Sequence, residues 1–343
     1  MMLHQMRTLV KKVNKTHKGL GPMIAINILA AKAKKAILNV APAGTGKSVA
    51  CDSVGLTLKE RSTRYTSLTL AGLSRLQDEF SHYDGHIIVD DLGSEKSIWS
   101  RVSTITALAN LVYTHFVYKV TYNSTIDIKD FNGSVSMNIQ PVLLNSLVQS
   151  DEWISVVRDK VMRYYHLFRP KMPRREWPEI DVKWGAALHE IELTGRGGKL
   201  WYQLISIGLT QWSYARVLEH IPDLLRAMAA LDGRMKVNAT DYYTLIKLLQ
   251  PLQLERYVIT TYGFEQGRVL DNNLYCILVE LASFKTPTIL TIAEDYKVNP
   301  RTAERLCQTV PEWCWIKANS PKKVMPTDMA KEILDICGVN QRW

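Results

Sequence analysis

The residues best suited to hold a polyphosphate lie in one short stretch, Ala41-Pro42-Ala43-Gly44-Thr45-Gly46-Lys47-Ser48. This stretch follows an apolar run at 35–40, and two glycines turn the chain before a helix that opens at Lys47. Such a turn directs backbone N–H groups and a helix N-terminus at one anion. We expect Lys47 to reach the β- and γ-phosphates and the Ser48 hydroxyl to ligate Mg²⁺. The residues expected around the nucleotide are Ala43, Gly44, Thr45, Gly46, Lys47, Ser48 and Val49.

Two carboxylates follow a second short apolar run, Ile87-Ile88-Val89-Asp90-Asp91. The run has the length of a buried parallel strand, which places both acids at its carboxyl end. There Asp90 is expected to hold Mg²⁺, directly or through water, and Asp91 to orient or activate the attacking water. Each motif alone has a plainer explanation, a loop before an ordinary helix or a turn after a strand. Together they predict that the chain binds ATP with Mg²⁺.

Charge is placed unevenly along the 343 residues, whose formal net charge is +10. No acidic residue precedes Asp52, so residues 1–20 form a basic N-terminal arm. Such an arm is either drawn to polyanions, with nucleic acid the usual candidate, or simply a solvated terminus. A second acid-free basic run, Arg163–Arg175, alternates bases with aromatics. It is expected either to grip a phosphate backbone and stack bases or to be a strand with an exposed exit loop.

Other classes of protein are disfavoured by composition. The five cysteines form no C-x-x-C pair, which argues against a disulfide framework or a zinc site. No apolar run reaches membrane-spanning length, and the N-terminus lacks a signal-peptide core. We therefore expect a reducing, cytoplasmic compartment, at the nucleoid if DNA is the target.

Strands are expected to alternate with helices through the first half of the chain. Helical patterns at 22–33, 48–59, 73–83 and 98–115 lie between β-rich runs at 35–40, 65–70 and 86–89. This order predicts an α/β domain with a doubly wound parallel sheet. A further strand is expected at 164–168, before Pro170, Pro173 and Pro178 mark a boundary.

Two alternatives exist for residues 116–140, which follow the helix expected at 98–115. Residues 116–122 and 125–131 alternate in polarity, which predicts a protruding β-hairpin. In that case the next core strand runs over 134–140 and leaves Asn138 or Gln140 at its tip, near the γ-phosphate. In the competing register, 117–122 is the core strand and Asn123 is its polar tip.

The last part of the chain predicts a winged-helix module. Helices at 288–296 and 300–310 are separated by a tight turn and followed by a strand, a wing and a returning strand at 313–324. Arg301, Thr302 and Arg305 on the second helix are expected to face a DNA major groove, with Lys322 and Lys323 in the wing. Many such modules bind protein instead, and the charge of this segment is nearly balanced.

The motifs at 44–48 and 87–91, with Ser213-Tyr-Ala-Arg216-Val-Leu-Glu219, resemble the AAA+ ATPase superfamily over residues 20–250. The resemblance implies a nucleotide-binding α/β domain with a small helical lid, assembled into rings or filaments. It divides the chain into the arm at 1–20, the AAA+ domain at 21–178, the lid at 179–265 and the winged helix at 266–343.

The resemblance also implies roles for single residues. Lys47 and Ser48 match the Walker A pair, and Asp90 and Asp91 match the Walker B pair. Asn138 or Gln140 matches sensor 1, Arg216 matches the sensor 2 arginine, and Arg158 matches the finger offered to a neighbour's ATP. The plainer alternatives are that Arg158 is a solvated helix end and Arg216 an ordinary surface residue.

Two departures from the family pattern stand in the motifs. Ala41 replaces a glycine, which only reduces the flexibility of the loop. Asp91 stands where most members have Glu, as in the Asp-Asp-Leu-Gly of replicative-helicase loaders. Because the shorter side chain withdraws the water-activating oxygen by about one methylene, slow hydrolysis is expected.

Two functions fit these observations. The first is an oligomeric ATPase acting on DNA, as a replication initiator, a loader that partners a replicative helicase, or a minichromosome-maintenance-like helicase. The second is a MoxR-like chaperone that remodels proteins, because Arg226–Arg234, Lys236-Val237 and Asp241 are similar to that family's lid. Stimulation of the ATPase by DNA distinguishes the two functions.

Overall fold

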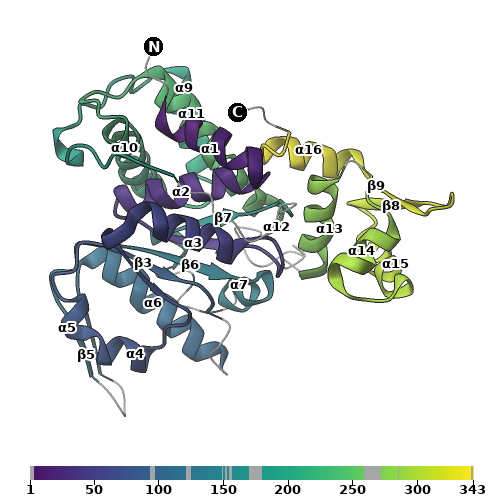
Figure 1. Cartoon of the computed structure of the whole chain (residues 1–343), viewed down its shortest axis with the longest axis horizontal. Helices are drawn as coiled ribbons and strands as arrows, with labels where there is room; N and C mark the ends of the chain where they lie inside the picture. The colour runs from purple at the N-terminus through teal and green to yellow at the C-terminus, as the bar shows by residue number, and fades with distance from the viewer. Residues whose placement is uncertain are drawn as a thin grey trace.

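A five-stranded parallel sheet forms the centre of the chain in a computed structural model (Figure 1). The structure describes residues 4–92, 97–120, 125–148, 150, 153, 157–169, 180–258, 272–284, 286–340 and 343. The strand order is β2-β3-β6-β1-β7, and each neighbouring pair is parallel. The strands are β1 (Ala36–Val40), β2 (Ser62–Tyr65), β3 (His86–Val89), β6 (Ser134–Ile139) and β7 (Val161–Tyr165). The predicted α/β class with a parallel sheet is confirmed.

Helices cover both faces of this sheet and bury its strands. Every residue of β1, β3, β6 and β7 is buried, as expected for parallel strands covered on two sides. Along β1, Ile37 packs with the helices of one face, whereas Leu38 packs with those of the other. The first face carries α2 (Leu20–Lys32) and α3 (Lys47–Leu58), and the second carries α6 (Ile98–Thr114).

The basic N-terminal segment is helical rather than a free arm. Helix α1 (Gln5–Thr16) buries Met6, Leu9, Val10 and Val13, which recur at a spacing of three or four residues. This apolar stripe packs on α2, while the lysines lie on the other side of the helix. Charge repulsion between those lysines is therefore outweighed by burial of the stripe.

The helices expected in the lid pack beside α1 and α2. They are α9 (Lys199–Gly208), α10 (Tyr214–Leu231) and α11 (Ala239–Leu249), and they share one hydrophobic core with α1, α2 and one face of the sheet. The predicted helical segment is confirmed from Lys199 onward, but its core is continuous with that of one face of the sheet. The connection through Pro170, Pro173 and Pro178 lies outside the described residues.

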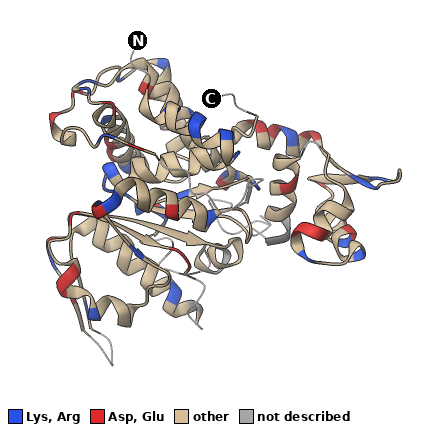
Figure 2. Ribbon diagram, in the orientation of Figure 1, with Lys and Arg blue, Asp and Glu red and all other residues tan. Residues whose placement is uncertain are grey.

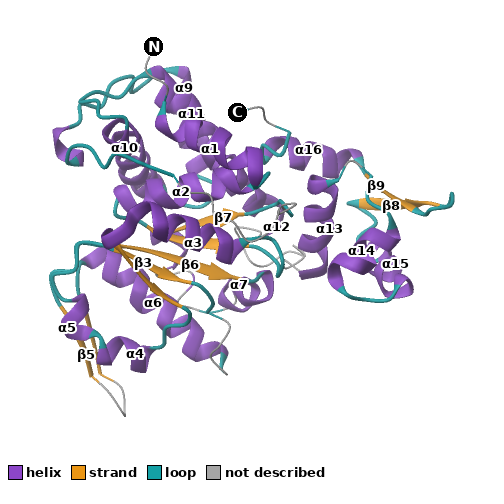
Figure 3. Cartoon of the chain, viewed as in Figure 1, coloured by secondary structure: helices purple, strands orange, loops and turns teal. Residues whose placement is uncertain are grey.

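The hairpin interpretation is confirmed over the alternative register. Strands β4 (Val117–Val120) and β5 (Thr125–Ile128) form an antiparallel pair of their own, beside α4 (Leu70–Arg75) and α5 (Gln77–Phe80). Figure 3 shows this pair apart from the central sheet. Asn123 lies outside the described residues.

The C-terminal part has the predicted order of elements, helix–turn–helix followed by two antiparallel strands. It comprises α13 (Asn272–Ser283), α14 (Ile289–Tyr296), α15 (Pro300–Gln308), β8 (Cys314–Lys317), β9 (Lys323–Pro326) and α16 (Asp328–Ile336). Lys297 forms the turn with a φ of 52°, and Asn299 caps α15 by accepting the Thr302 N–H at 2.8 Å. This part lies at the right of Figure 1, with β8 and β9 at its outer edge.

Short elements complete the chain. They are η1 (Lys59–Arg61), α7 (Pro141–Val148), α8 (Arg158–Lys160), η3 (Leu188–Glu190), η4 (Gln250–Leu254) and α12 (Glu255–Val258). Two predicted strands are shifted toward the N-terminus: those expected at 65–70 and 164–168 lie at 62–65 and 161–165. The helix expected at 73–83 is divided into α4 and α5. No helix in the described part of the chain is both long and apolar enough to cross a membrane.

A buried ion pair joins β7 to the helical part of the chain. Arg163 on β7 is 0% exposed and donates to both carboxylate oxygens of Glu255, at 2.6 and 3.0 Å. The Tyr165 hydroxyl donates to the same carboxylate at 2.9 Å. Arg163 therefore does not grip nucleic acid, and the rest of that basic run, from residue 170 to Arg175, lies outside the described residues.

Removal of one partner from this ion pair is expected to destabilise the fold strongly. Glu255→Leu leaves the buried Arg163 guanidinium uncompensated, so the free energy of unfolding should fall by about 3–5 kcal/mol in urea titrations. Adding Arg163→Met should recover much of the loss. Glu192→Gln is the control, because its Lys236 partner is 61% exposed and such pairs contribute little. Equal losses for the two single variants would contradict the role given to the buried pair.

Candidate functional site

The glycine-containing stretch forms a tight loop between β1 and α3. Gly44 and Gly46 have φ values of 74° and 86°, in the left-handed region where a residue with a Cβ is strained. The Thr45 hydroxyl donates to the Pro42 carbonyl at 2.8 Å and closes the loop on itself. Because α3 begins at Lys47, the free N–H groups of its first turn point toward the loop. The backbone thus has a tight, left-handed turn directly before a helix N-terminus, whereas the binding of phosphate stays a prediction.

Lys47 folds over the loop that precedes it. Its Nζ donates to the carbonyls of Ala41 at 2.5 Å and Pro42 at 2.7 Å. Burial lowers the pKa of Lys47 to about 8, and the charge of Asp91 partly opposes this shift. The ammonium group is therefore held at the loop, within the electrostatic influence of the second predicted carboxylate. These carbonyl contacts hold the cation where phosphate oxygens would be bound.

The carboxylates lie at the carboxyl end of β3, as predicted. The Asp90 and Asp91 N–H groups donate to the carbonyls of Tyr65 at 2.9 Å and Thr66 at 3.0 Å, at the end of β2. The Asp90 side chain is 12% exposed, whereas Asp91 is exposed. The two carboxylates therefore differ in environment, and the more buried one suits a fixed metal ligand.

Of the two described sensor 1 candidates, Asn138 and Gln140, Asn138 is the one that lies beside Asp90. Its Nδ2 is 3.5 Å from Asp90 Oδ1 and 3.0 Å from the Cys51 sulfur, and its side chain is buried. Gln140 is exposed at the end of β6, where its carbonyl accepts hydrogen bonds from the start of α7. The pairing of β6 between β1 and β3 thus brings Asn138 to the two carboxylates.

A chain of buried amides fixes the orientation of Asn138. Asn39 on β1 donates to the Asn138 oxygen at 3.2 Å and exchanges two 3.0 Å hydrogen bonds with Asn27 on α2. Asn27 also donates to the Met23 carbonyl at 2.7 Å. Since the Asn138 oxygen is engaged, its N–H₂ group is directed at Cys51 and Asp90. Buried amides so connected are rigid, because each broken bond leaves an unsatisfied polar group.

Arg64 is a site residue that the sequence did not reveal. It lies on β2 and forms ion pairs with both Asp90 and Asp52. Asp52 is one helical turn after Ser48, so the hydroxyl and the two carboxylates supply the oxygen ligands that Mg²⁺ prefers. The donor set therefore fits the ion, and Arg64 competes with it for Asp90. The sequence signal that could have indicated Arg64 was a cation in the strand directly after the helix at 47–58.

A second group of residues missed from the sequence follows β7. His166 is buried, its Nε2 is 3.2 Å from the Thr45 carbonyl, and burial lowers its pKa to about 4, so the ring is neutral. A Cβ placed on Gly44 would lie 3.1 Å from Nη1 of Arg169. That guanidinium therefore lies against the loop at 41–48, which we call the phosphate loop after its predicted ligand. Both residues follow the strand that pairs with β1, and that adjacency was their only signal.

Arg169 also contacts the C-terminal part of the chain. Its Nε donates to the fully buried carboxylate of Glu280 on α13 at 3.0 Å and is 3.6 Å from Asp295 on α14. Its guanidinium stacks 4.7 Å over Tyr296. The Tyr275 hydroxyl of α13 donates to the Val40 carbonyl at 2.8 Å, directly before the phosphate loop. The C-terminal part is thus attached to the edge of the sheet where the site lies.

The two arginines expected to act on ATP lie at the other end of the sheet. Arg158 belongs to α8, directly before β7. Arg216 donates to Glu219 at 2.8 Å and is 3.5 Å from Asp159 on α8. Because α8 precedes β7 and the phosphate loop follows the adjacent parallel strand, neither arginine is brought to the phosphate loop of its own chain.

The residues predicted to bind DNA lie on the surface of the C-terminal part. Arg301, Arg305 and Lys323 are exposed, whereas Lys322 is paired with Glu304 at 2.6 Å. Thr302 is engaged in the cap of α15, with its hydroxyl 3.0 Å from Asn299. Figure 2 shows basic and acidic residues on every part of the ribbon, rather than one continuous basic stripe.

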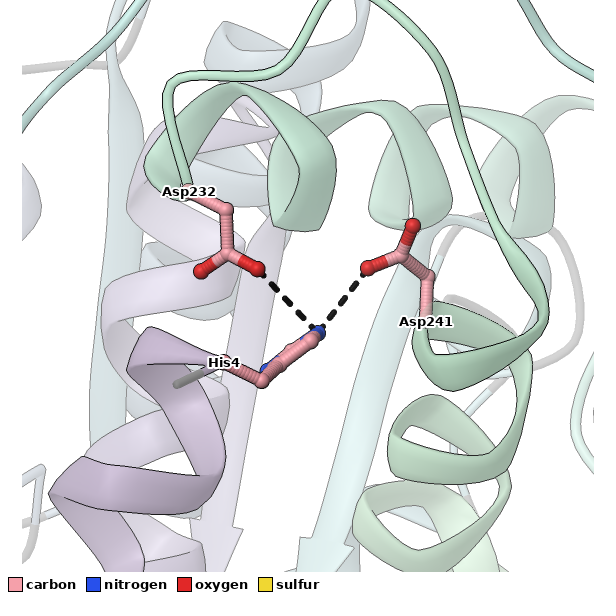
Figure 4. Close-up of side chains that lie close together, drawn as sticks. All are labelled: His4, Asp232 and Asp241. Carbon is pink, nitrogen blue, oxygen red and sulfur yellow. Dashed lines mark hydrogen bonds and ion pairs between the residues drawn. The ribbon is translucent and has the colours of Figure 1, made fainter. Parts of the chain in front are cut away.

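A cluster of His4, Asp232 and Asp241 has the composition of a metal site but is held by other contacts. The His4 Nε2 lies 2.9 Å from Asp241 and 3.6 Å from Asp232 (Figure 4). Arg234 reaches both carboxylates, at 2.9 and 2.5 Å. Its positive charge already neutralises the acids and disfavours a cation. The cluster instead fastens α1 to the ends of α10 and α11.

Comparisons with known proteins leave the chain without a family. No protein-family profile and no curated protein matches it. Among solved structures it is similar to "The A form apo structure of NrS-1 C terminal region-CTR", at 12% identity and a TM-score of 0.30, over 95% of this chain and 76% of that one. A second structure of that region has the same identity and coverage and a TM-score of 0.24. Likenesses at these TM-scores carry no argument about fold or function.

The lowered pKa of Lys47 predicts how nucleotide affinity depends on pH. An anion binds the charged ammonium, so the affinity for ATP in EDTA should be level below pH 8 and fall by up to tenfold per unit above it. The phosphates of ATP are already ionised in this range, since their last pKa is about 6. Calorimetric titration at several pH values measures the slope. Lys47→Arg stays charged throughout and should show a flat profile, and parallel profiles would refute the assignment.

Proposed function

We propose that this protein is a P-loop ATPase of the AAA+ type. The observation that carries the proposal is the convergence of three sequence-distant groups at one edge of the sheet. These groups are the loop at 41–48, the carboxylates at 90–91 and Asn138, whose amide is 3.5 Å from Asp90. A parallel sheet binds ligands at the carboxyl ends of its strands, so the position agrees with the chemistry.

The residues of this edge have distinct roles in the proposed reaction. Bound Mg²⁺ and ATP would supply the electrophilic phosphorus and neutralise the charge of the leaving group. Loop N–H groups and Lys47 hold the phosphates, and Ser48 with Asp90 provides the oxygen ligands for the metal. Asp91, exposed at the mouth of the site, orients the attacking water and accepts its proton. Asn138 positions Asp90 through its amide.

An oligomer is proposed because Arg158, the predicted finger, lies away from the phosphate loop of its own chain. Of the described arginines at the site, Arg64 is paired with Asp52 and Asp90, and Arg169 is paired with Glu280. Arg158 lies at the opposite end of β7, where it suits the ATP of a neighbouring subunit rather than its own. A finger of this kind stabilises transition-state charge only across an interface.

Action on DNA is the proposed use of the ATPase. The hairpin β4–β5 exposes Tyr118, which is 67% exposed, and Phe116, which directly precedes β4, is 56% exposed. Lys119, on the other face of β4, lies 5.9 Å from the ring centroid of Trp99. Exposed aromatics of this kind suit the stacking of single-stranded bases. The helix–turn–helix and strands at 289–326 are proposed to be a winged helix, with Arg301 and Arg305 exposed on its second helix.

The MoxR-like alternative has no separate support in the structure. Arg234 and Asp241, which carried part of that resemblance, are engaged with His4 in fastening α1. A structural role accounts for these residues without a remodelling function. DNA therefore remains the preferred partner, with a replicative helicase or another replication protein as a further proposed partner.

Three variants test the proposal. Lys47→Ala should lose ATP binding, whereas Asp91→Asn and Arg158→Ala should bind ATP but lose hydrolysis. For Arg158→Ala the loss arises between subunits, so wild-type activity per subunit should rise with protein concentration. Phosphate release is measured with and without single- and double-stranded DNA, beside particle size by light scattering. Undiminished ATP binding by Lys47→Ala would refute the site, and indifference to both DNAs would transfer the proposal to protein remodelling.

Arg169 is proposed to transmit nucleotide binding to the C-terminal part. It lies against Gly44, and its Nη2 is buried without a hydrogen-bond partner among the described residues, as is Oε2 of Glu280. Burial raises the pKa of Glu280 to about 7, which weakens its hold on the guanidinium near neutral pH. Glu280 and a phosphate of bound ATP would therefore compete for the guanidinium of Arg169. A shift to the phosphate would release α13.

Opposite changes at the two residues test this exchange. Arg169→Ala should weaken ATP binding about ten- to a hundredfold, since a hydrogen bond to a charged group contributes roughly 1.5–3 kcal/mol. Glu280→Gln should strengthen binding, because the guanidinium loses its competing partner. The double variant should behave like Arg169→Ala alone. Calorimetry measures the affinities, and a Glu280→Gln variant that binds ATP no better than wild type would contradict the exchange.

A further inference from the structure

A second cavity lies at the amino-terminal edge of the sheet, opposite the phosphate loop. Its volume is about 850 Å³, and residues just before three strands line it, namely Lys34 before β1, Arg61 before β2 and Gly133 before β6. The wall is completed by Trp184, which lies in a loop, and by Arg226 on α10. A strand of five residues spans about 16 Å, so the cavity and the nucleotide site are separate. The volume lies in the range of sites for small molecules.

Positive charges exceed negative ones in this cavity. Its two acids are each paired, Asp84 with Lys34 at 2.7 Å and Asp223 with Lys35 at 2.6 Å. Glu190, near Lys32, accepts the Ala187 N–H at 3.1 Å. The remaining cations of the lining, Lys32, Arg61 and Arg226, have no carboxylate partner in the described part of the chain. Uncompensated like charges at one concave surface repel one another unless an anion joins them.

The three cations have donors to offer. The Arg226 Nε is buried and has no hydrogen-bond partner among the described residues. Arg61 contacts the ring of Trp184, whose centroid is 5.5 Å away, and Lys32 lies 5.2 Å from the same centroid. Lys32 also donates to the Ala186 carbonyl at 2.7 Å. Burial and the charges of Lys34 and Arg61 lower the pKa of Lys32, which an anion would reverse.

Close backbone packing holds the wall of the cavity in place. Gly185 has a φ of 65°, and a Cβ there would lie 1.7 Å from the Ala230 carbonyl oxygen of α10. A Cβ on Gly133 would lie 2.5 Å from the Gly85 carbonyl oxygen. The loop that carries Trp184 is therefore pressed against α10, near the turn that bears Arg226. Such a wall is formed without the ligand, and this reduces the entropy that binding must overcome.

We propose that this cavity is a second anion site, which binds a phosphate group through Arg61, Arg226 and Lys32. Guanidinium groups match phosphate oxygens with paired, charge-assisted hydrogen bonds, and the lysine adds a point charge. The phosphate comes either from a free oligophosphate or nucleotide or from the backbone of a nucleic acid. The cavity is independent of ATP binding at the phosphate loop.

The test removes the phosphate loop from the measurement. In a Lys47→Ala background, binding of inorganic triphosphate is measured by calorimetry and binding of a labelled oligo(dT) by fluorescence anisotropy. Adding Arg61→Gln and Arg226→Gln should weaken triphosphate binding at least tenfold. The control adds Lys236→Gln and Lys331→Gln, an equal charge loss at residues 61% and 57% exposed, and should leave it unchanged.

The oligonucleotide identifies the source of the phosphate. Parallel weakening of oligo(dT) binding assigns the cavity to nucleic-acid backbone, and unaltered oligo(dT) binding assigns it to free phosphates. The proposal would be overturned if the cavity variant and the control bound both ligands with equal affinity. It would also be overturned if neither ligand bound saturably to the Lys47→Ala protein. Melting temperatures verify folding, and Arg226→Lys, which keeps the charge but not the fork, should bind with intermediate affinity.

Discussion

The insertion of β6 between β1 and β3 is the constraint on which the proposed site depends. Its register pairs Asn138 with Asn39 of β1 and places Met137 opposite Val89, one residue before Asp90. Three segments separated by some fifty residues each are thereby aligned at their carboxyl ends. Backbone hydrogen bonds fix this alignment, and the buried amides of Asn27, Asn39 and Asn138 make any slip costly, because each would lose its partners.

Local patterns in the sequence predicted those parts of the fold that are determined locally. The glycines of the loop, the apolar run before Asp90 and the alternation of the hairpin each specify a backbone conformation within a few residues. Helix α1 was not foreseen, because its apolar stripe is interspersed with lysines, and those lysines led to the expectation of a basic arm, either drawn to polyanions or solvated. Arg216 matched a family motif, yet its ion pair with Asp159 keeps it beside α8.

Contacts between distant segments account for the site residues that sequence reasoning missed. Arg64, His166 and Arg169 have no distinctive neighbours in the chain, and each reaches the site only because its strand is adjacent to β3 or β1. Such residues are encoded by strand order, which a single sequence does not display. The attachment of α13 through Tyr275 has the same origin, and it places the C-terminal part next to the end of β1 that precedes the glycine-containing loop.

The hydrogen bonds of Lys47 to Ala41 and Pro42 have a kinetic meaning. If the loop binds a triphosphate as proposed, its departure leaves no bare ammonium, because the carbonyl oxygens of Ala41 and Pro42 replace the phosphate oxygens. Release is thereby made easier and capture weaker than in a loop whose lysine waits unpaired. A loop of this kind favours fast release of the nucleotide over long retention, which a protein that works through repeated cycles requires.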